Sequence, residues 1–264
     1  MKHIKSKSEL NSKVRLLLGS GGFFGKPETV EFMAEQTDAF LGLAVSQVLV
    51  VPYAQEDYSS ANRLIERAGL FKNRSFFRID EAADPVRAIE EAQAIVVFGG
   101  NTFRLLNLMY QKKILGPIQE RVLGGTPYLG VSAGTNVACP TLMTTNDMPI
   151  VQPPSFNALN LVPFQINPHY FSGPIYSKVA GEYEKYAGET RDDRISEFLS
   201  HNEQDVLGLP EGTFLRVEAG KVVYLNPVEK TGNQRPVRVF RKGRTPEDFG
   251  HQVDLVEALG LKPF

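Results

Sequence analysis

The first residue with clear chemical potential is Ser132, the centre of a Gly-x-Ser-x-Gly pattern at residues 130–134. The pattern follows an apolar run typical of a strand and precedes a segment that could begin a helix. Such a serine is exposed on a sharply bent backbone, because its small neighbours leave room for the bend and for a substrate. The N–H of Ala133 would then point toward the oxyanion that forms when a serine attacks a carbonyl. The competing interpretation is a serine that only caps a helix.

A second glycine-rich turn, Gly99-Gly100, follows another apolar run and precedes a predicted helix. In a parallel sheet the carboxyl ends of the strands share one edge, so this turn could lie beside Ser132. Gly100 could supply a second oxyanion donor there, with Asn101 as a substrate contact. An equally good interpretation is a tight turn in which Asn101 caps the helix.

A nucleophilic serine needs a general base, and the chain has only four histidines. Three of them lie in polar or charged segments, which leaves His169, after a strand-like stretch, as the predicted base. A loop histidine that only packs or bonds the backbone is the alternative. Two carboxylates could orient it: Glu211, which ends a predicted buried strand, and Asp147, in an irregular loop. Spacing alone does not choose between them, and each could be an ordinary turn residue.

The composition limits the alternatives. The 264 residues carry a formal net charge of -1, which argues against nucleic acid or an anionic membrane as a partner. Cys139 is the only cysteine, so no intramolecular disulfide can form, and it is predicted to be a small core residue. No apolar run approaches membrane-spanning length, and the scattered histidines show no zinc-ligand spacing. We therefore expect a cytoplasmic protein without a metal or other cofactor.

Two further segments are interpreted as structural. Residues 19–26 are rich in glycine but match neither common phosphate-binding pattern, and they predict a flexible turn at the sheet edge near the site. The basic cluster formed by Arg238, Arg241, Lys242 and Arg244 is interpreted as a solvated strand end and turn.

The elements that must position the candidate residues alternate along the chain. Strands are predicted at 14–18, 47–52, 75–79, 94–98, 127–131, 206–209, 214–217, 221–224 and 237–240, and helices at 28–43, 59–68, 85–92, 101–111, 191–201 and within 246–259. This rhythm predicts an α/β fold with a mostly parallel, doubly wound sheet. Residues 140–174 lack periodicity, but their apolar content predicts an ordered loop. No linker is evident, so residues 1–264 are predicted to form one domain.

Longer segments around these residues carry a family resemblance. They are the Gly-x-Ser-x-Gly pattern, Thr-Thr-Asn-Asp-Met-Pro-Ile-Val at 144–151, Gln-Ile-Asn-Pro-His at 165–169, Gly-Glu-Thr-Arg-Asp-Asp-Arg at 188–194 and Gly-Leu-Pro-Glu-Gly at 208–212. Together these segments resemble the peptidase E family of α-aspartyl dipeptidases across residues 14–225. The chain departs from the family at Val131, where tryptophan is common, and at Thr135, where alanine is frequent.

The resemblance implies a flavodoxin-like three-layer sandwich related to class I glutamine amidotransferases. It also implies a metal-free serine peptidase that cleaves dipeptides with an N-terminal aspartate. By position, Ser132 would be the nucleophile, His169 the base, and the N–H groups of Ala133 and Gly100 the oxyanion donors. The family assigns the third member to either carboxylate; Glu211 is preferred because a strand end is more rigid than a loop, and Asp147 would then shape the substrate pocket.

Substrate and partners are predicted more loosely. Arg191 or Arg194 is expected to pair with the aspartate side chain of the dipeptide, because a guanidinium binds a carboxylate through two hydrogen bonds. A homodimer is possible. The alternatives are a cyanophycinase-like β-aspartyl peptidase and a catalytically silent metabolite-binding protein. A glutaminase-type enzyme would need a cysteine where Ser132 stands.

Overall fold

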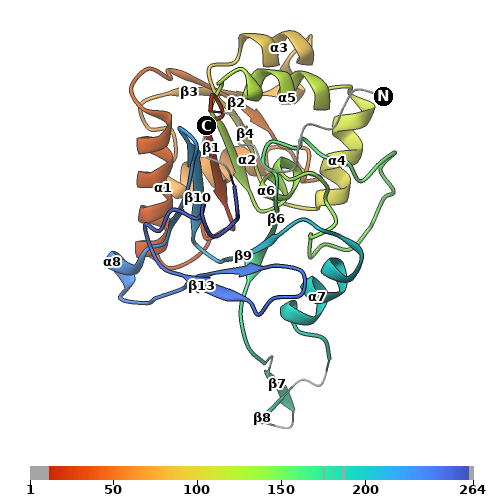
Figure 1. Cartoon of the computed structure of the whole chain (residues 1–264). Helices are drawn as coiled ribbons and strands as arrows, with labels where there is room; N and C mark the ends of the chain where they lie inside the picture. The colour runs from red at the N-terminus through yellow and green to blue at the C-terminus, as the bar shows by residue number, and fades with distance from the viewer. Residues whose placement is uncertain (1–11, 175, 180, 186–187, 262–264) are drawn as a thin grey trace.

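The computed structural model describes residues 12–174, 176–179, 181–185 and 188–261. A seven-stranded sheet forms the centre of the molecule, in the order β11-β10-β1-β5-β4-β2-β3 (Figure 1). Its strands are β1 (Leu16–Gly19), β2 (Gln47–Val51), β3 (Ser75–Arg78), β4 (Ile95–Val97), β5 (Tyr128–Val131), β10 (Phe214–Glu218) and β11 (Lys221–Leu225). The strands β1 to β5 run parallel, and the predicted strands β10 and β11 form an antiparallel hairpin at one edge.

Helices cover both faces of this sheet because apolar side chains point alternately to each face. Leu17 packs in the core under the first two helices, whereas Leu16 and Leu18 pack in the core under the next four. The helices are α1 (Pro27–Leu41) and α2 (Ser60–Ala68) on one face, and α3 (Pro85–Glu91), α4 (Thr102–Gln111), α5 (Leu115–Leu123) and α6 (Ala133–Ala138) on the other. The predicted three-layer, doubly wound arrangement is therefore confirmed. Among the residues that the structure describes, no helix is long and apolar enough to cross a bilayer.

A second sheet, in the order β13-β12-β9-β6, was not predicted as a separate unit. Its strands are β6 (Gln165–Tyr170), β9 (Val206–Pro210), β12 (Val237–Phe240) and β13 (Glu247–Phe249). The edge strand β6 runs parallel to β9, and helix α7 (Arg191–His201) packs Ile195 and Leu199 against this sheet. The hairpin of β7 (Tyr176–Val179) and β8 (Glu182–Lys185) projects from the body at the bottom of Figure 1. The short helices η1 (Ile79–Glu81) and α8 (Val228–Thr231) complete the elements of the described residues.

The helix predicted within residues 246–259 is wrong, because this segment supplies β13 and a series of turns. Asp248 lies opposite Arg238 in the β12–β13 ladder and forms an ion pair with it at 2.7 Å. Further along, the N–H of Leu255 donates to the carbonyl of Val222 at 2.7 Å. These long-range pairings stabilise an extended path that the local sequence pattern does not encode.

The basic cluster lies at a strand end and turn, as predicted, and Lys242 and Arg244 are exposed, whereas Arg238 and Arg241 are more buried than expected. Arg238 pairs with Asp248 and Asp192, and Lys242 pairs with Glu203. Arg241 pairs with Glu247, and its side chain is only 16% exposed. These side chains therefore tie the second sheet together.

One helix was not predicted, and the long irregular segment has the order that was predicted for it. Helix α5 escaped prediction because Gly116 and Pro117 interrupt its pattern, yet proline is tolerated in a first helical turn, where its missing N–H is not needed. The irregular segment before β6 is ordered, as predicted: Leu159 is buried, and its N–H donates to the carbonyl of Val137 at 2.8 Å. In sequence, this segment connects α6 to β6, and it contains Asp147.

Candidate active site

Ser132 stands directly between β5 and α6, on a backbone with φ 54° and ψ −108°. A non-glycine residue with positive φ is strained by roughly 1–2 kcal/mol. The turn is held by its backbone, since the N–H of Ser132 donates to Gly19 O on β1 at 2.9 Å. Gly134 packs so closely against the carbonyl of Val97 on β4 that no Cβ fits there. The neighbours of β5 on both sides therefore build the sharp turn that the Gly-x-Ser-x-Gly pattern predicts.

The structure brings His169 and Glu211 to this serine from the second sheet. The Oγ of Ser132 lies 2.7 Å from His169 Nε2, and His169 Nδ1 is hydrogen-bonded to the Glu211 carboxylate. His169 belongs to β6, and Glu211 directly follows the parallel strand β9. The side chains of His169 and Glu211 are 42% and 49% exposed. A hydroxyl, an imidazole and a carboxylate thus form one chain that a solvent-borne substrate can approach, the arrangement needed to activate a serine.

His169 sits on an irregular backbone. The ladder between β6 and β9 shifts register between Pro168 and Tyr170, and His169 has φ 55°. Its N–H donates to the Ser20 hydroxyl at 2.7 Å, while the carbonyl of Pro168 accepts from Asn146 Nδ2 at 2.7 Å. Sequence reasoning named neither Ser20 nor Asn146 as a site residue. For Ser20 a signal existed: it follows β1, whose carboxyl end lies beside that of β5.

The two predicted oxyanion donors lie on the same edge of the central sheet, after β4 and β5. Within the described part of the chain, neither Gly100 N–H nor Ala133 N–H donates a hydrogen bond. Gly100 has φ 143°, a conformation that strains any side chain, and its backbone packs against the carbonyl of Ala54. Both amides are thus available for an external acceptor, and their role in catalysis stays a prediction.

Among the described contacts Asp147 makes no hydrogen bond to His169 and instead binds at the start of α4. Its Oδ2 accepts hydrogen bonds from Thr102 N at 2.7 Å, from Thr102 Oγ1 at 2.6 Å and from Thr145 Oγ1 at 3.2 Å. A carboxylate at this position satisfies a helix N-terminus and complements its dipole. Asn101 is similarly occupied, because its side chain accepts from Arg104 N at 3.0 Å and donates to Met148 O at 2.9 Å.

The two candidate arginines differ in their surroundings. Arg194 lies on the exposed face of α7, with a side chain 54% exposed, and is 3.6 Å from Glu189. Arg191 is half-buried, and its guanidinium stacks 5.7 Å above the Phe171 ring centre and donates to Asn146 Oδ1 at 2.6 Å. Burial, followed by the nearby charge of Arg194, lowers the pKa of Arg191.

Arg191 also retains unused capacity to bind an anion. Its buried Nε has no hydrogen-bond partner, and no carboxylate of the described residues forms an ion pair with it. A buried charge without a counter-ion is costly, so such a group favours an anionic ligand.

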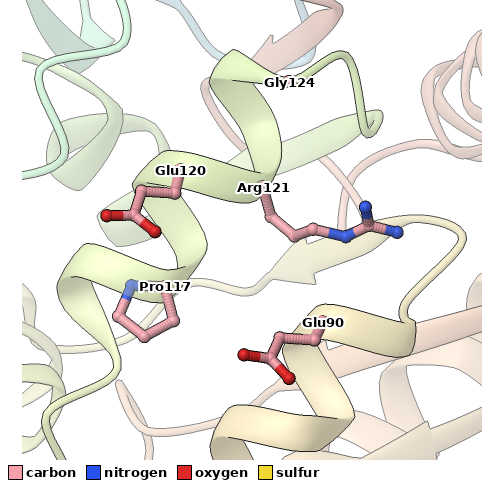
Figure 2. A pocket seen from close by; sticks show the side chains of 5 residues that line it. All are labelled: Glu90, Pro117, Glu120, Arg121 and Gly124. Carbon is pink, nitrogen blue, oxygen red and sulfur yellow. The ribbon is translucent and has the colours of Figure 1, made fainter.

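Other candidate features of the molecule are a cavity between two helices, the single cysteine and the possibility of a metal site. A cavity of about 220 Å³ lies between α3 and α5, lined by Glu90, Pro117, Glu120, Arg121 and Gly124, and it contains none of the candidate residues (Figure 2). Cys139 is fully buried, as predicted, and burial raises the pKa of its thiol to about 12. In the described ranges, no three His, Cys, Asp or Glu side chains gather closely enough to hold a metal ion. Metal independence stays a prediction from the resemblance.

The doubly wound sheet and the serine turn at its carboxyl edge define a serine hydrolase arrangement on the class I glutamine amidotransferase-like fold. The sequence model of peptidase family S51 matches residues 16–225 of this chain. The chain therefore belongs to this family. The roles of the individual residues remain predictions from geometry and resemblance.

Relatives of known name agree with this membership. The chain is 42% identical over 219 residues to peptidase E of Streptomyces coelicolor, covering 83% of this chain and 84% of that protein. It is 40% identical over 241 residues to the "probable alpha-aspartyl dipeptidase" of Drosophila melanogaster, covering 91% and 95%. The solved structure of a peptidase from an acI-B1 actinobacterium has the same fold, with a TM-score of 0.51 at 16% identity over 91% of this chain and 99% of that one. The predicted family resemblance is confirmed.

Proposed function

We propose that this chain is a serine dipeptidase that hydrolyses dipeptides with an N-terminal aspartate. The observation that carries the proposal is the continuous chain from Ser132 Oγ through His169 to the Glu211 carboxylate. Membership of family S51, and the relative named "probable alpha-aspartyl dipeptidase", support this substrate class. The cyanophycinase-like and silent-binder alternatives are not favoured.

In the proposed reaction, Ser132 Oγ attacks the carbonyl carbon of the aspartyl residue while His169 Nε2 accepts the serine proton. Glu211 accepts a hydrogen bond from the Nδ1 proton, which fixes the tautomer and stabilises the imidazolium that forms. The N–H groups of Gly100 and Ala133 stabilise the oxyanion. His169 then protonates the leaving amine, and an ester of aspartate remains on Ser132. A water molecule, deprotonated by His169, attacks this ester and releases free aspartate.

Arg191 is the better candidate for binding the aspartate side chain, because it has a buried, unpaired Nε and no carboxylate partner among the described residues. Arg194 already lies beside Glu189 and faces solvent. A substrate carboxylate would supply the missing counter-ion of Arg191 through a charge-assisted hydrogen bond. We expect Arg191→Ala to reduce the preference for Asp-Leu over Ala-Leu by about 10- to 100-fold, in line with the loss of such a bond.

The test compares hydrolysis of α-Asp-Leu, β-Asp-Leu and Ala-Leu by the wild type and Ser132→Ala, with EDTA present. We expect cleavage of α-Asp-Leu alone, unchanged by EDTA and reduced in Ser132→Ala by about 10⁴- to 10⁶-fold, as when other serine hydrolases lose the nucleophile. A preference for β-Asp-Leu would replace the proposal with a β-aspartyl peptidase. Absence of cleavage of all three would refute the dipeptidase proposal.

We also propose a cytoplasmic location, supported by the single cysteine, which is buried and free. A small peptide as the only partner, a homodimer and a single domain remain predictions.

A further inference from the structure

The peptide group between Pro168 and His169 lies where the regular pairing of β6 with β9 is interrupted. Strand β6 lies at the edge of its sheet and pairs with β9 on one side only. The register shift between Pro168 and Tyr170 leaves His169 bulged out of that pairing. A bulge re-aims a side chain, but it also leaves backbone groups that need other partners.

Side chains from two distant segments supply these partners. The carbonyl of Pro168 accepts from Asn146 Nδ2, and the N–H of His169 donates to Ser20 Oγ, each at 2.7 Å. Both groups belong to one planar peptide unit, so the unit is held at both ends. Ser20 is itself fully buried, and its N–H donates to Thr213 O at 3.1 Å. The hydroxyl that holds His169 therefore sits on a fixed backbone at the end of β1.

Asn146 extends this arrangement toward Arg191. Its Oδ1 accepts from Arg191 Nη1 at 2.6 Å and from Asn167 Nδ2 at 2.9 Å. The amide group of Asn146 thus lies between the guanidinium and the carbonyl of Pro168. A change in the position of the Arg191 guanidinium would therefore be transmitted through the Asn146 side chain to the peptide group between Pro168 and His169.

We propose that Ser20 and Asn146 are positioning residues that hold His169 in its left-handed backbone conformation, and that Asn146 couples this conformation to Arg191. The inference rests on the proposed role of His169 as the base for Ser132. Without the two side chains, the bulge could relax and carry the imidazole away from the serine. A misplacement of about 1 Å can reduce a catalytic rate by about 100-fold.

The experiment measures how fast an uncharged alkyl fluorophosphonate labels Ser132, because this reaction needs the base but no dipeptide recognition. The variants are Ser20→Ala, which removes the acceptor of His169 N–H, and Asn146→Asp, which keeps an acceptor for Arg191 but loses the donor to Pro168. Thr37→Val is the matched control, since it too deletes a buried hydroxyl bonded to the backbone; the Thr37 hydroxyl donates to the carbonyl of Met33 within α1.

We expect labelling to slow by about 10- to 100-fold in Ser20→Ala and in Asn146→Asp, and by less than about twofold in the control. With α-Asp-Leu, kcat should fall by the same factor in Ser20→Ala while KM stays within about twofold, because transition-state stabilisation is lost rather than ground-state binding. Thermal unfolding of each variant identifies any general loss of fold. If Ser20→Ala does not fold, Asn146→Asp alone decides, because Asn146 lies in a partly exposed loop. Labelling at the wild-type rate in folded variants would overturn the proposal.

The coupling to Arg191 is tested with the same probe, which has no carboxylate for Arg191 to bind. We expect Arg191→Ala to slow labelling by about threefold or more, and to have no further effect in an Asn146→Ala background, as for residues that act through one network. Labelling of Arg191→Ala at the wild-type rate would overturn the coupling. If the wild type is labelled but cleaves no aspartyl dipeptide, the proposed function fails, while the labelling rates still decide whether Ser20 and Asn146 position the base.

Discussion

The backbone of the Ser132 turn is held by the backbone of the neighbouring strands, whereas His169 is held by side chains, at both its N–H and its ring. The N–H of Ser132 donates to Gly19 O, and the backbone of Gly134 packs against Val97 O. By contrast, His169 is held by Ser20 Oγ on its N–H and by Glu211 on its ring. The nucleophile is therefore positioned by the sheet itself, and the candidate base by side chains that connect the two sheets.

This difference predicts how each half of the site fails. On the serine side, activity should be lost only when the central sheet itself is disturbed, so that a loss of activity comes together with a loss of stability. A substitution on the histidine side should reduce activity in a protein that remains folded. The experiments below test this contrast in order of decreasing expected effect.

Glu211→Gln should have the largest effect, a fall in kcat of about 10²- to 10⁴-fold, because an amide cannot hold the imidazole tautomer and its developing charge as a carboxylate does. Hydrolysis of α-Asp-Leu measures it, and thermal unfolding should be almost unchanged, since the Glu211 side chain is half exposed. Asp147→Asn is the matched control, because Asp147 contacts Thr102 and Thr145 rather than His169. It should cost about 1 kcal/mol of stability, as expected for a weakened helix cap. A larger loss of kcat in Asp147→Asn than in Glu211→Gln would reverse the assignment of the two carboxylates.

Gly134→Ala should come next and act on the fold. The new Cβ would overlap the carbonyl oxygen of Val97, and two backbone segments of the packed centre cannot separate cheaply. We expect destabilisation of about 3 kcal/mol or more, at the upper end of overpacking effects, and loss of activity with it. Urea unfolding followed by circular dichroism measures this change. A stable but inactive Gly134→Ala protein would show that the serine turn is not built into the sheet.

Gly21→Ala should show the opposite behaviour. A Cβ at Gly21 would lie 2.5 Å from Glu211 Oε1 and 2.8 Å from His169 Cε1. The Glu211 carboxylate is the end of a flexible side chain, so it can move at small cost in stability, but its contact with His169 would be disturbed. We expect kcat to fall by about 10- to 100-fold, as for a misplaced catalytic group, with an unfolding free energy within about 1 kcal/mol of the wild type. An active Gly21→Ala enzyme would remove the contrast between the two halves of the site.

The same contrast explains which parts the sequence allowed us to predict. The strand, turn and helix around Ser132 follow from local signals: an apolar run, two glycines and a serine between them. The central sheet was predictable for the same reason, because each βα unit repeats a local pattern. Asp84 illustrates such a local signal: it directly precedes Pro85, and its side chain caps α3 by accepting from the N–H groups of Val86 and Arg87.

The second sheet and the surroundings of His169 depend on long-range pairing. Strand β13 forms where a helix was predicted, because its partner β12 and the ion pair of Arg238 with Asp248 lie outside any local window. Ser20 and His169 are 149 positions apart in sequence, so their hydrogen bond leaves no spacing signal. The sequence still identified His169 as the candidate base, because the chain has few histidines. It could not show which carboxylate would be hydrogen-bonded to His169.

The smallest predicted effect concerns Thr135, which the chain carries where alanine is frequent in the family. Its buried Oγ1 lies 2.7 Å from Gly19 O and 3.0 Å from Gly130 O, and thus adds a side-chain bond to the serine turn. Thr135→Val removes this hydroxyl with little change of shape. We expect a loss of about 1 kcal/mol, the usual net value of such a hydrogen bond, and a decrease in Tm of about 2–4 °C. Because Ser132 N–H donates to Gly19 O in its own right, kcat for α-Asp-Leu should stay within about twofold of the wild type. A tenfold loss of kcat at unchanged Tm would mean that a side chain, rather than the backbone, holds the nucleophile, and the two halves of the site would then be built alike.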